Sequence, residues 1–514
     1  MKTIHPVSLL AAVAILLPAP AAVAGLVVGA PVDVIGNLSP AQFTSLGYGT
    51  NSYKDWGNEP FVAVNPTNPN DTFISSFAYS TSSTTSGANV FYSTTGGSSW
   101  TSQFSVPSPT SGVTIPNDWN FTYNSAGTLH GAILGGGNIF QGSTADPTSL
   151  AAWSYTGGGT PINIAASARN ADQPWLALNG SRVFVAYDDF HSNTAERVAV
   201  SNNNGASFTV DNFINNGAQA NSVNPGTRIA TDGNGTVYSI FGVGGTTISQ
   251  GIHDVTYYLN RSRDGGVTWD FNGSSAIGGI TVASGVSSQL DNAGTQASNN
   301  WFAHVNDLRG NITAIAPDKT GAHIYVLYGA QDNTGTDRIY LREFHPVGAT
   351  LVGSAPLVIS PAFQRAALPA ITVKDDGTVV MMYETFGDDG KIHIHVASSD
   401  DFGASIDSDI EEYSFKPLTL LQATGSTTSN REFGDYDFLT SIGDTFYGTF
   451  AGLGDVNIDG INTTGLIDPF FFAGTDAVPE PASLSLLLAA LAAAGLFRAR
   501  KSGGGRGSAI GLGS

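Results

Sequence analysis

The chain has 514 residues and a formal net charge of −20, although only 12% of its residues are charged. This excess of acid disfavours contact with nucleic-acid phosphates, so we expect no nucleic-acid partner. The chain has no cysteine, which excludes disulfides and thiolate metal sites. Its 62 glycines, with abundant Ser, Thr and Asn, favour short strands and many turns, and therefore an all-β fold.

Residues 1–24 have the three parts of a secretory signal peptide. Lys2 provides the positive start, residues 7–17 form an apolar core, and Ala22-Val23-Ala24 is a small-residue cleavage site before Gly25. We therefore expect an exported protein from which this segment is removed.

Residues 57–475 repeat one pattern, in which a polar or charged residue is followed by an apolar strand, a turn and a second apolar strand. Seven copies follow one another at a mean spacing of about 63 residues. They begin near Glu59, Asp118, Asp172, Arg228, Asp307, Pro369 and Asp435. This regular spacing indicates that one structural unit is repeated along the chain.

A second motif, Ser-x-Asp-x-Gly-x-Thr-Trp, occupies residues 262–269, with weaker copies at 93–100, 201–208 and 399–406. Asp and Gly favour a tight hairpin turn, the hydroxyl groups can bind loop amides, and the aromatic residue covers the turn. We interpret these octamers as structural staples without a catalytic role. The residues that define them are Ser93, Trp100, Ser201, Phe208, Ser262, Asp264, Gly266, Trp269, Ser399, Asp401 and Gly403.

The octamers resemble the Asp-box (BNR) repeat of β-propellers in the sialidase superfamily. The resemblance implies that residues 57–475 form a β-propeller of four-stranded blades, with each octamer closing an outer hairpin. Seven repeats favour seven blades; six blades with an inserted element is the alternative, because sialidases have six. Residues 25–56 could supply the strand that closes the ring.

In a propeller, the residues that precede the innermost strands converge on the central axis. We therefore expect a candidate ligand site there. Its candidate residues are Glu59, Arg228, Asp307, Arg365, Arg431 and Asp435, with Asp118 and Asp172 in equivalent positions. These groups could hold a charged ligand or a metal ion, or they could pair with one another as a ring of structural salt bridges.

The resemblance also implies which residues a sialidase-like glycoside hydrolase would need. Such enzymes bind the substrate carboxylate with three arginines, for which Arg228, Arg365 and Arg431 are the candidates. The Phe-Arg-Ile-Pro opening of the family is missing, and its nearest match is Thr227-Arg228-Ile229-Ala230. The set of arginine motifs is therefore incomplete.

The other catalytic groups of the family are a Tyr nucleophile beside a Glu, and an Asp for acid/base work. Tyr383 and Glu384 are adjacent in a predicted strand, so their side chains should point to opposite faces and not cooperate. Asp118 and Asp172 are equal candidates for the acid. The catalytic residues, and whether the protein is an enzyme, stay open.

Residues 455–462 begin like a calcium-binding loop, Asp-x-Asn-x-Asp-Gly, but the twelfth position is Leu466 instead of a bidentate acid. We interpret the segment as a hairpin loop before a final strand at residues 469–473. We predict no cofactor, with Ca²⁺ as the alternative.

The C-terminal segment, residues 476–501, resembles the PEP-CTERM sorting segment of Gram-negative bacteria. Pro479-Glu480-Pro481 precedes an apolar run at 482–497, predicted as a helix, and a basic cluster at 498–501. The resemblance implies that a processing enzyme in the membrane recognises this triplet and removes the tail; a permanent membrane anchor is the alternative. The Gly-rich tail, residues 502–514, has no explanation in this pattern.

Together these features predict an exported β-propeller associated with the cell envelope or the extracellular matrix. Its expected partner is a glycan or exopolysaccharide, or its role is structural. The alternative is an exo-sialidase-like glycoside hydrolase.

Overall fold

The structure is a computed structural model, and it describes the chain in segments. These are residues 25–45, 57–77, 88–110, 113, 118–149, 152–164, 170–190, 195–216, 227–249, 252–289, 301–302, 306–307, 313–416, 434–454, 457–458, 461–462 and 467–476. Residues Leu26–Thr475 form one compact unit, which is the part described below.

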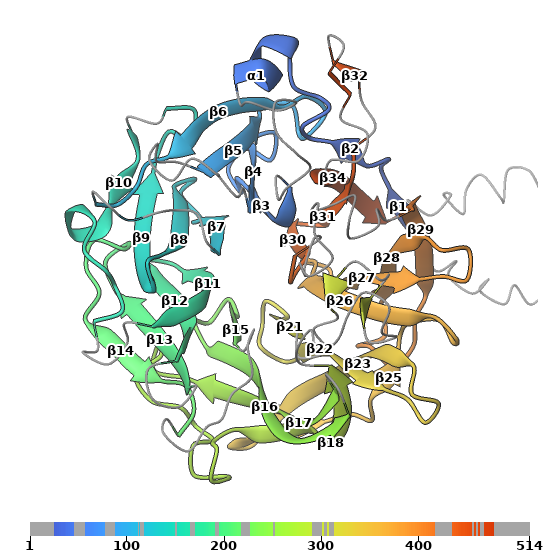
Figure 1. The fold of residues 1–514 in the computed structure, drawn as a ribbon. Coiled ribbons are helices and arrows are strands. Elements are labelled where there is room, and N and C mark those ends of the chain that lie inside the picture. Colours follow the sequence, from blue (N-terminus) through green and yellow to red (C-terminus); the bar gives the residue numbers. More distant parts are fainter. Residues whose placement is uncertain are drawn as a thin grey trace, which may run out of the picture. The chain divides into compact units, whose positions relative to one another are not determined.

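Seven antiparallel sheets follow one another around a central axis (Figure 1). In the first six sheets the strands run outward from the axis in chain order, and in the seventh the N-terminal strands lie outermost. The innermost strands are β3, β7, β11, β15, β21, β26 and β30 (Figure 1). The protein is therefore an all-β propeller with seven blades, as the repeat count predicted.

The first three blades account for the chain up to Phe213. Blade 1 consists of β3 (Asn58–Val64), β4 (Thr72–Phe77), β5 (Ala88–Ser93) and β6 (Thr101–Val106). Blade 2 consists of β7 (Trp119–Tyr123), β8 (Leu129–Gly135), β9 (Asn138–Thr144) and β10 (Ser154–Tyr155), which leads into the 3-10 helix η2 (Thr156–Gly158). Blade 3 consists of β11 (Ala171–Asn179), β12 (Arg182–Asp189), β13 (Ala195–Ser201) and β14 (Val210–Phe213).

The next three blades have the same plan. Blade 4 consists of β15 (Arg228–Thr231), β16 (Val237–Ser249), β17 (Ile252–Ser262) and β18 (Ile280–Gln289). Blade 5 consists of β21 (Thr313–Pro317), β22 (Ile324–Gln331), β23 (Asp337–Val347) and β24 (Thr350–Gly353), with β25 (Leu357–Val358) also paired to β23. Blade 6 consists of β26 (Arg365–Val373), β27 (Val379–Phe386), β28 (Ile392–Ser399) and β29 (Ser408–Phe415).

Blade 7 combines both ends of the compact unit. Its strands are β30 (Phe438–Ile442), β31 (Thr445–Leu453) and β34 (Ile467–Asp476), and β34 pairs with both β1 (Leu26–Val28) and β2 (Val32–Asp33). The short pairs β19 (Trp301–Phe302) with β20 (Asn306–Asp307), and β32 (Asn457–Ile458) with β33 (Ile461–Asn462), stand apart from the blades, as does helix α1 (Pro40–Ser45).

The N-terminal segment also contacts blade 1. Val34, Ile35 and Leu38 are buried in one apolar cluster with residues of blades 7 and 1. The side-chain oxygen of Asn37 accepts a hydrogen bond of 2.9 Å from the backbone N–H of Trp100 in blade 1. Because β1 and β2 pair with the last strand, the first described residues tie the end of the ring to its beginning.

The apolar core of the described residues lies between the blades. It divides into seven clusters, and each cluster joins two successive blades, including blades 7 and 1. Each blade therefore buries both of its faces against neighbours, which explains why a single repeat unit could not fold alone.

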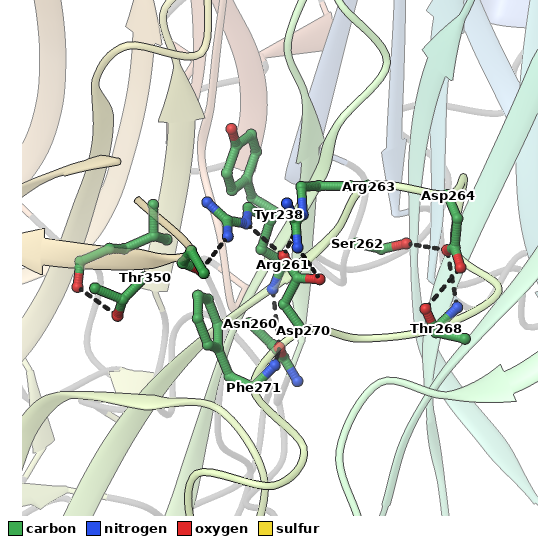
Figure 2. A network of polar contacts seen from close by, with 12 residues as sticks. Tyr238, Asn260, Arg261, Ser262, Arg263, Asp264, Thr268, Asp270, Phe271 and Thr350 are labelled. Atoms are coloured by element: carbon green, nitrogen blue, oxygen red, sulfur yellow. Dashed lines mark hydrogen bonds and ion pairs between the residues drawn. The ribbon is translucent and has the colours of Figure 1, made fainter. Parts of the chain in front are cut away.

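The four octamers share two hydrogen bonds. The Ser hydroxyl at the first position accepts the N–H of the Gly at the fifth position, at 2.8 Å for Ser262 and Gly266 and at 2.9–3.0 Å in the other three copies. The third side chain accepts the N–H of the seventh residue, as Asp264 does from Thr268 at 2.9 Å (Figure 2). These bonds shape the turn between the third and fourth strands of blades 1, 3, 4 and 6.

The fifth-position glycines face the preceding blade. Gly266 has φ +83°, and a Cβ there would lie 2.9 Å from Val200 of blade 3. Gly97 faces Phe471 of blade 7, and Gly403 faces Leu341 of blade 5 in the same way. The octamers therefore pack one blade onto the previous one, at a distance from the axis.

Replacing the hydroxyl of an octamer is expected to lower stability. Ser262→Ala leaves the buried N–H of Gly266 without its acceptor, which should cost about 1–3 kcal/mol in the free energy of unfolding. Urea unfolding measures the change. The matched control is Ser98→Ala, an exposed serine of the first octamer, which should change the free energy by less than about 0.5 kcal/mol. Equal effects of the two substitutions would contradict the staple interpretation.

None of the helices in the described part of the chain is long and apolar enough to cross a membrane. The predicted apolar helix at 482–497, like the signal peptide and the Gly-rich tail, lies outside the described residues.

Candidate functional site

Three of the innermost strands share an unusual backbone. Glu59, Gln173 and Leu368 have φ values of 50°, 48° and 52°, and each precedes a proline. The strand register shifts at each of these places. Positive φ is costly for a residue with a side chain, and the position before proline normally favours extended backbone. Such bulges redirect side chains, and the first two lie in the polar layer at the axis.

This polar layer consists of side chains from four blades. The amide nitrogen of Gln173 donates to Asp118 at 3.2 Å and to Asp435 at 3.4 Å. A carboxylate oxygen of Glu59 accepts the backbone N–H of Asp435 at 3.0 Å. The carboxyl group of Asp118 is also hydrogen-bonded to those of Glu59 and Asp172. We call Glu59, Asp118, Asp172, Gln173 and Asp435 the axial carboxyl layer.

Two members of the axial carboxyl layer have strongly raised pKa values. Burial, followed by the charge of Glu59, raises the pKa of Asp118 well above its ordinary value. Burial, followed by the charge of Asp118, raises the pKa of Asp172 to about 8. A hydrogen bond between two carboxyl groups requires a proton on one of them. The layer therefore offers both donors and acceptors at neutral pH.

An arginine and four aromatic rings lie next to this layer. Arg228 is 1% exposed, and its guanidinium lies 4.1 Å from the ring centre of Trp175 and 5.7 Å from that of Tyr436. It donates to the backbone oxygen of Thr227 at 3.0 Å and to Gln173 at 3.5 Å. The rings of Phe61 and Phe438 stack at 3.6 Å beside them, in edge contact with Trp175. We call Arg228, Trp175, Tyr436, Phe61 and Phe438 the arginine–aromatic base.

Burial lowers the pKa of Arg228, while the neighbouring charges of Asp188, Asp435 and Asp118 oppose this effect. A cavity of about 290 Å³ lies along the axis and is lined by residues of β7, β11, β15, β21, β26 and β30. Arg228, Trp175 and Tyr436 line it, whereas the axial carboxyl layer does not. The arginine–aromatic base therefore separates the polar layer from the cavity.

The other predicted site residues have different surroundings. Arg365 pairs with Asp337 of blade 5, with 2.7 Å between Nε and Oδ2. The backbone of Asp307 lies in the separate β19–β20 pair, and Arg431 lies outside the described residues. The structure thus brings together Glu59, Asp118, Asp172, Arg228 and Asp435 from the predicted set.

Tyr383 and Glu384 point to different neighbours. The hydroxyl of Tyr383 donates to Asp409 at 2.8 Å within blade 6. Glu384 is completely buried and is hydrogen-bonded to Asp437 of blade 7, and burial raises its pKa well above the ordinary value. This adjacent pair does not assemble into a Tyr–Glu nucleophile.

Gln173, Trp175 and Tyr436 were not among the site residues predicted from the sequence. A signal for Gln173 was present, because Glu59-Pro60 and Gln173-Pro174 occur at the same point of two repeats. Within the described residues, no group of three or more His, Asp or Glu side chains has a geometry that could hold a metal ion.

The carboxyl group of Asp118 is directly hydrogen-bonded to that of Glu59 and to that of Asp172. The two catalytic carboxyl groups of most glycosidases are about 5–9.5 Å apart. Asp118 is therefore closer to each of these two neighbours than the members of such a catalytic pair.

Residues 477–501 match the PEP-CTERM protein-sorting motif. This motif indicates an exported protein that is sorted to the cell envelope. The matched residues lie outside the described part of the chain. No curated protein matches the chain.

Several solved structures are similar to this chain at low sequence identity. A protein of unknown function from Dyadobacter fermentans has a TM-score of 0.42 at 10% identity, covering 88% of this chain and 99% of that one. An α-L-arabinanase from Penicillium chrysogenum, complexed with arabinobiose, has a TM-score of 0.44 at 11% identity and the same coverage. A Hadza microbial sialidase has a TM-score of 0.35 at 12% identity, covering 82% of this chain and 66% of its own. These likenesses are too distant to support a statement about substrate.

Proposed function

We propose that this exported, envelope-sorted propeller binds uncharged glycan, such as a neutral exopolysaccharide, through its axial carboxyl layer. The proposal depends mainly on the proton-sharing contacts of Asp118 with Glu59 and Asp172, supported on the arginine–aromatic base. The sorting motif at residues 477–501 is consistent with a ligand in the cell envelope.

The chemistry of the layer matches that of sugar hydroxyl groups. A protonated carboxyl group donates a hydrogen bond, an ionised one accepts, and the amide of Gln173 does both. Asp118 and Asp172 are partly exposed, which would let a ligand reach them, whereas Glu59 and Asp435 are buried. Polar groups held by rigid neighbours favour specific binding, because little side-chain freedom is lost.

The charge of the layer favours an uncharged ligand over sialic acid. The carboxyl groups of Asp188, Asp435 and Asp118 act on one guanidinium, and that guanidinium already contacts Gln173 and Trp175. Among the described residues that line the axial cavity, Arg228 is the one arginine. An anionic sugar would be repelled, so we propose binding and not a sialidase-like reaction.

The test is a glycan array probed with residues 25–476 and with an Asp172→Ala variant. Neutral oligosaccharides should bind, and the variant should bind at least about tenfold more weakly, because alanine has no group that can donate to or accept from the ligand and Asp118. Asp375→Ala, which changes an exposed aspartate paired with Lys319, is the matched control and should bind normally. Preferential binding of sialylated or uronate glycans, or an unaffected Asp172→Ala variant, would overturn the proposal.

A fluorogenic sialoside assay separates binding from hydrolysis. No turnover is expected from the intact protein. Turnover that is lost in Arg228→Lys would instead support the hydrolase alternative.

A further inference from the structure

Two aspartates meet where the two ends of the ring are joined. Asp33 is the last residue of β2, and Asp468 is the second residue of β34, to which β2 pairs. Their carboxyl groups contact each other. One strand belongs to the N-terminal segment and the other to the end of the propeller, so this pair lies at the closure of the ring.

Asp468 has no compensating donor in the described part of the chain. Its side chain is 0% exposed, and neither of its carboxylate oxygens accepts a hydrogen bond from an N–H group there. Oδ1 of Asp33 accepts the N–H of Gly36 at 2.8 Å, while its Oδ2 is buried and has no such donor. Burial, followed by the charge of Asp33, raises the pKa of Asp468, and no cationic group opposes this effect.

The backbone closes tightly around this pair. A Cβ at Gly454, the residue after β31, would overlap Oδ2 of Asp468 and would lie 3.2 Å from Oδ2 of Asp33. A Cβ at Gly57, before β3, would overlap the backbone of Asp468. Both approaches require glycine: Gly454 lies against the two carboxylates, and Gly57 lies against the backbone of Asp468.

Three of the four carboxylate oxygens of this pair are buried without a donor, so the pair needs a proton or a cation between its two groups. One shared proton would leave one negative charge in the interior, which is costly. A divalent cation neutralises both groups and gives each oxygen a ligand. Oxygens bound to Ca²⁺ at about 2.4 Å and at right angles lie about 3.4 Å apart, so two carboxylates in mutual contact suit one ion.

We propose that Asp33 and Asp468 bind a divalent cation of the calcium type and that this ion fastens the ring. Asp33 is partly exposed, which gives an ion access to the pair. The ion would join β2 to β34 without any contact to the axial carboxyl layer. The proposal is therefore independent of the proposed glycan binding.

The sequence next to the pair has a composition suited to this ion. Directly after Gly454 it reads Asp-Val-Asn-Ile-Asp-Gly, a pattern of oxygen-bearing side chains that calcium loops share. At the twelfth position the pattern has Leu466 where a calcium loop has an acid. The structure places the carboxylates of Asp33 and Asp468 beside Gly454, the residue directly before the pattern. Most of residues 455–466 lie outside the described part of the chain, so we assign only Asp33 and Asp468 as ligands.

The experiment measures the melting temperature of the exported protein at pH 7.5 after dialysis against EDTA, with and without about 5 mM CaCl₂. Calcium should raise the melting temperature by about 3 °C or more, and Asp468→Asn should abolish the rise. Asp407→Asn, which changes the exposed Asp400–Asp407 pair, is the matched control and should keep the full rise.

No rise in the unsubstituted protein, or a full rise in Asp468→Asn, would overturn the proposal. If Asp468→Asn does not fold, Asp33→Asn decides the question by calorimetric titration with Ca²⁺. One binding site fewer than in the unsubstituted protein supports the proposal, and an unchanged number of sites contradicts it.

Discussion

Raising the pH from 5 to 8 is expected to lower the free energy of unfolding by at least about 4 kcal/mol. Burial raises the pKa of Asp437 to about 8, and burial with the charge of Asp118 raises that of Asp172 to about 8. In the unfolded chain both groups titrate near pH 4. Their stabilisation is therefore complete below about pH 4 and is lost as the pH rises through about 8. Urea unfolding at a series of pH values measures this loss.

A variant can assign part of this pH dependence to one pair. Glu384→Gln keeps the size of the side chain beside Asp437 but removes one titrating carboxyl group. Its unfolding free energy should fall less steeply between pH 5 and 8, and it should approach or exceed that of the unsubstituted protein at pH 8. A profile that rises with pH, or an unchanged slope in this variant, would contradict the assignment.

Replacing Arg228 by methionine is expected to lower the free energy of unfolding by about 3–5 kcal/mol. The substitution removes the cation from a completely buried position next to Asp188, Asp435 and Asp118, and it removes the contact with Trp175. The negative charges then lack their counter-charge in the interior. Chemical unfolding at pH 7 measures the loss.

Two further variants show which property of Arg228 matters. Arg228→Lys keeps the charge but lacks the planar group that lies on Trp175, so an intermediate loss of about 1–2 kcal/mol is expected. Arg263→Met is the exposed control, because Arg263 pairs with Asp270 at 2.7 Å while its side chain is 59% exposed (Figure 2). It should cost much less than Arg228→Met, because solvent screens an exposed ion pair. Equal losses in Arg228→Met and Arg263→Met would contradict a stabilising role of the axial arginine.

The propeller could be predicted because each repeat has a recognisable pattern of polar and apolar residues in the sequence. Each unit begins with a polar residue, continues with two apolar strands and returns after about 63 residues, and the structure confirms seven such sheets. The all-β character follows from the same composition of turns and strands. These signals depend only on residues that are close together in the sequence, so one sequence is enough to recognise them.

Part of the candidate site could be predicted for the same reason. Glu59, Asp118, Asp172 and Asp435 lie at the beginnings of repeats, and a closed ring brings such positions together. Arg365 shows the limit of this argument. It also begins an inner strand, but Asp337 of the neighbouring blade binds it, and the sequence holds no sign of that pairing.

The aromatic members of the arginine–aromatic base could not be predicted, because their position depends on packing across the axis. Trp175 and Tyr436 are 261 positions apart in the chain, yet their rings lie 5.5 Å apart and flank Arg228. The backbone bulge at Gln173 allows its side chain to contact Asp118 and Asp435 of other blades. The positive φ of this residue runs against the extended backbone that the position before proline favours, so the contacts in the closed ring hold it.

The proton shared within the axial carboxyl layer is the feature on which the proposed glycan binding depends. Calorimetric titration with a neutral oligosaccharide selected on the array, repeated from pH 5 to 9, tests it most directly. The affinity should fall by at least about tenfold as the pH rises through about 8, where Asp172 loses its proton, and Asp172→Ala should bind weakly at every pH. An affinity that is constant or that increases over this range would contradict the account.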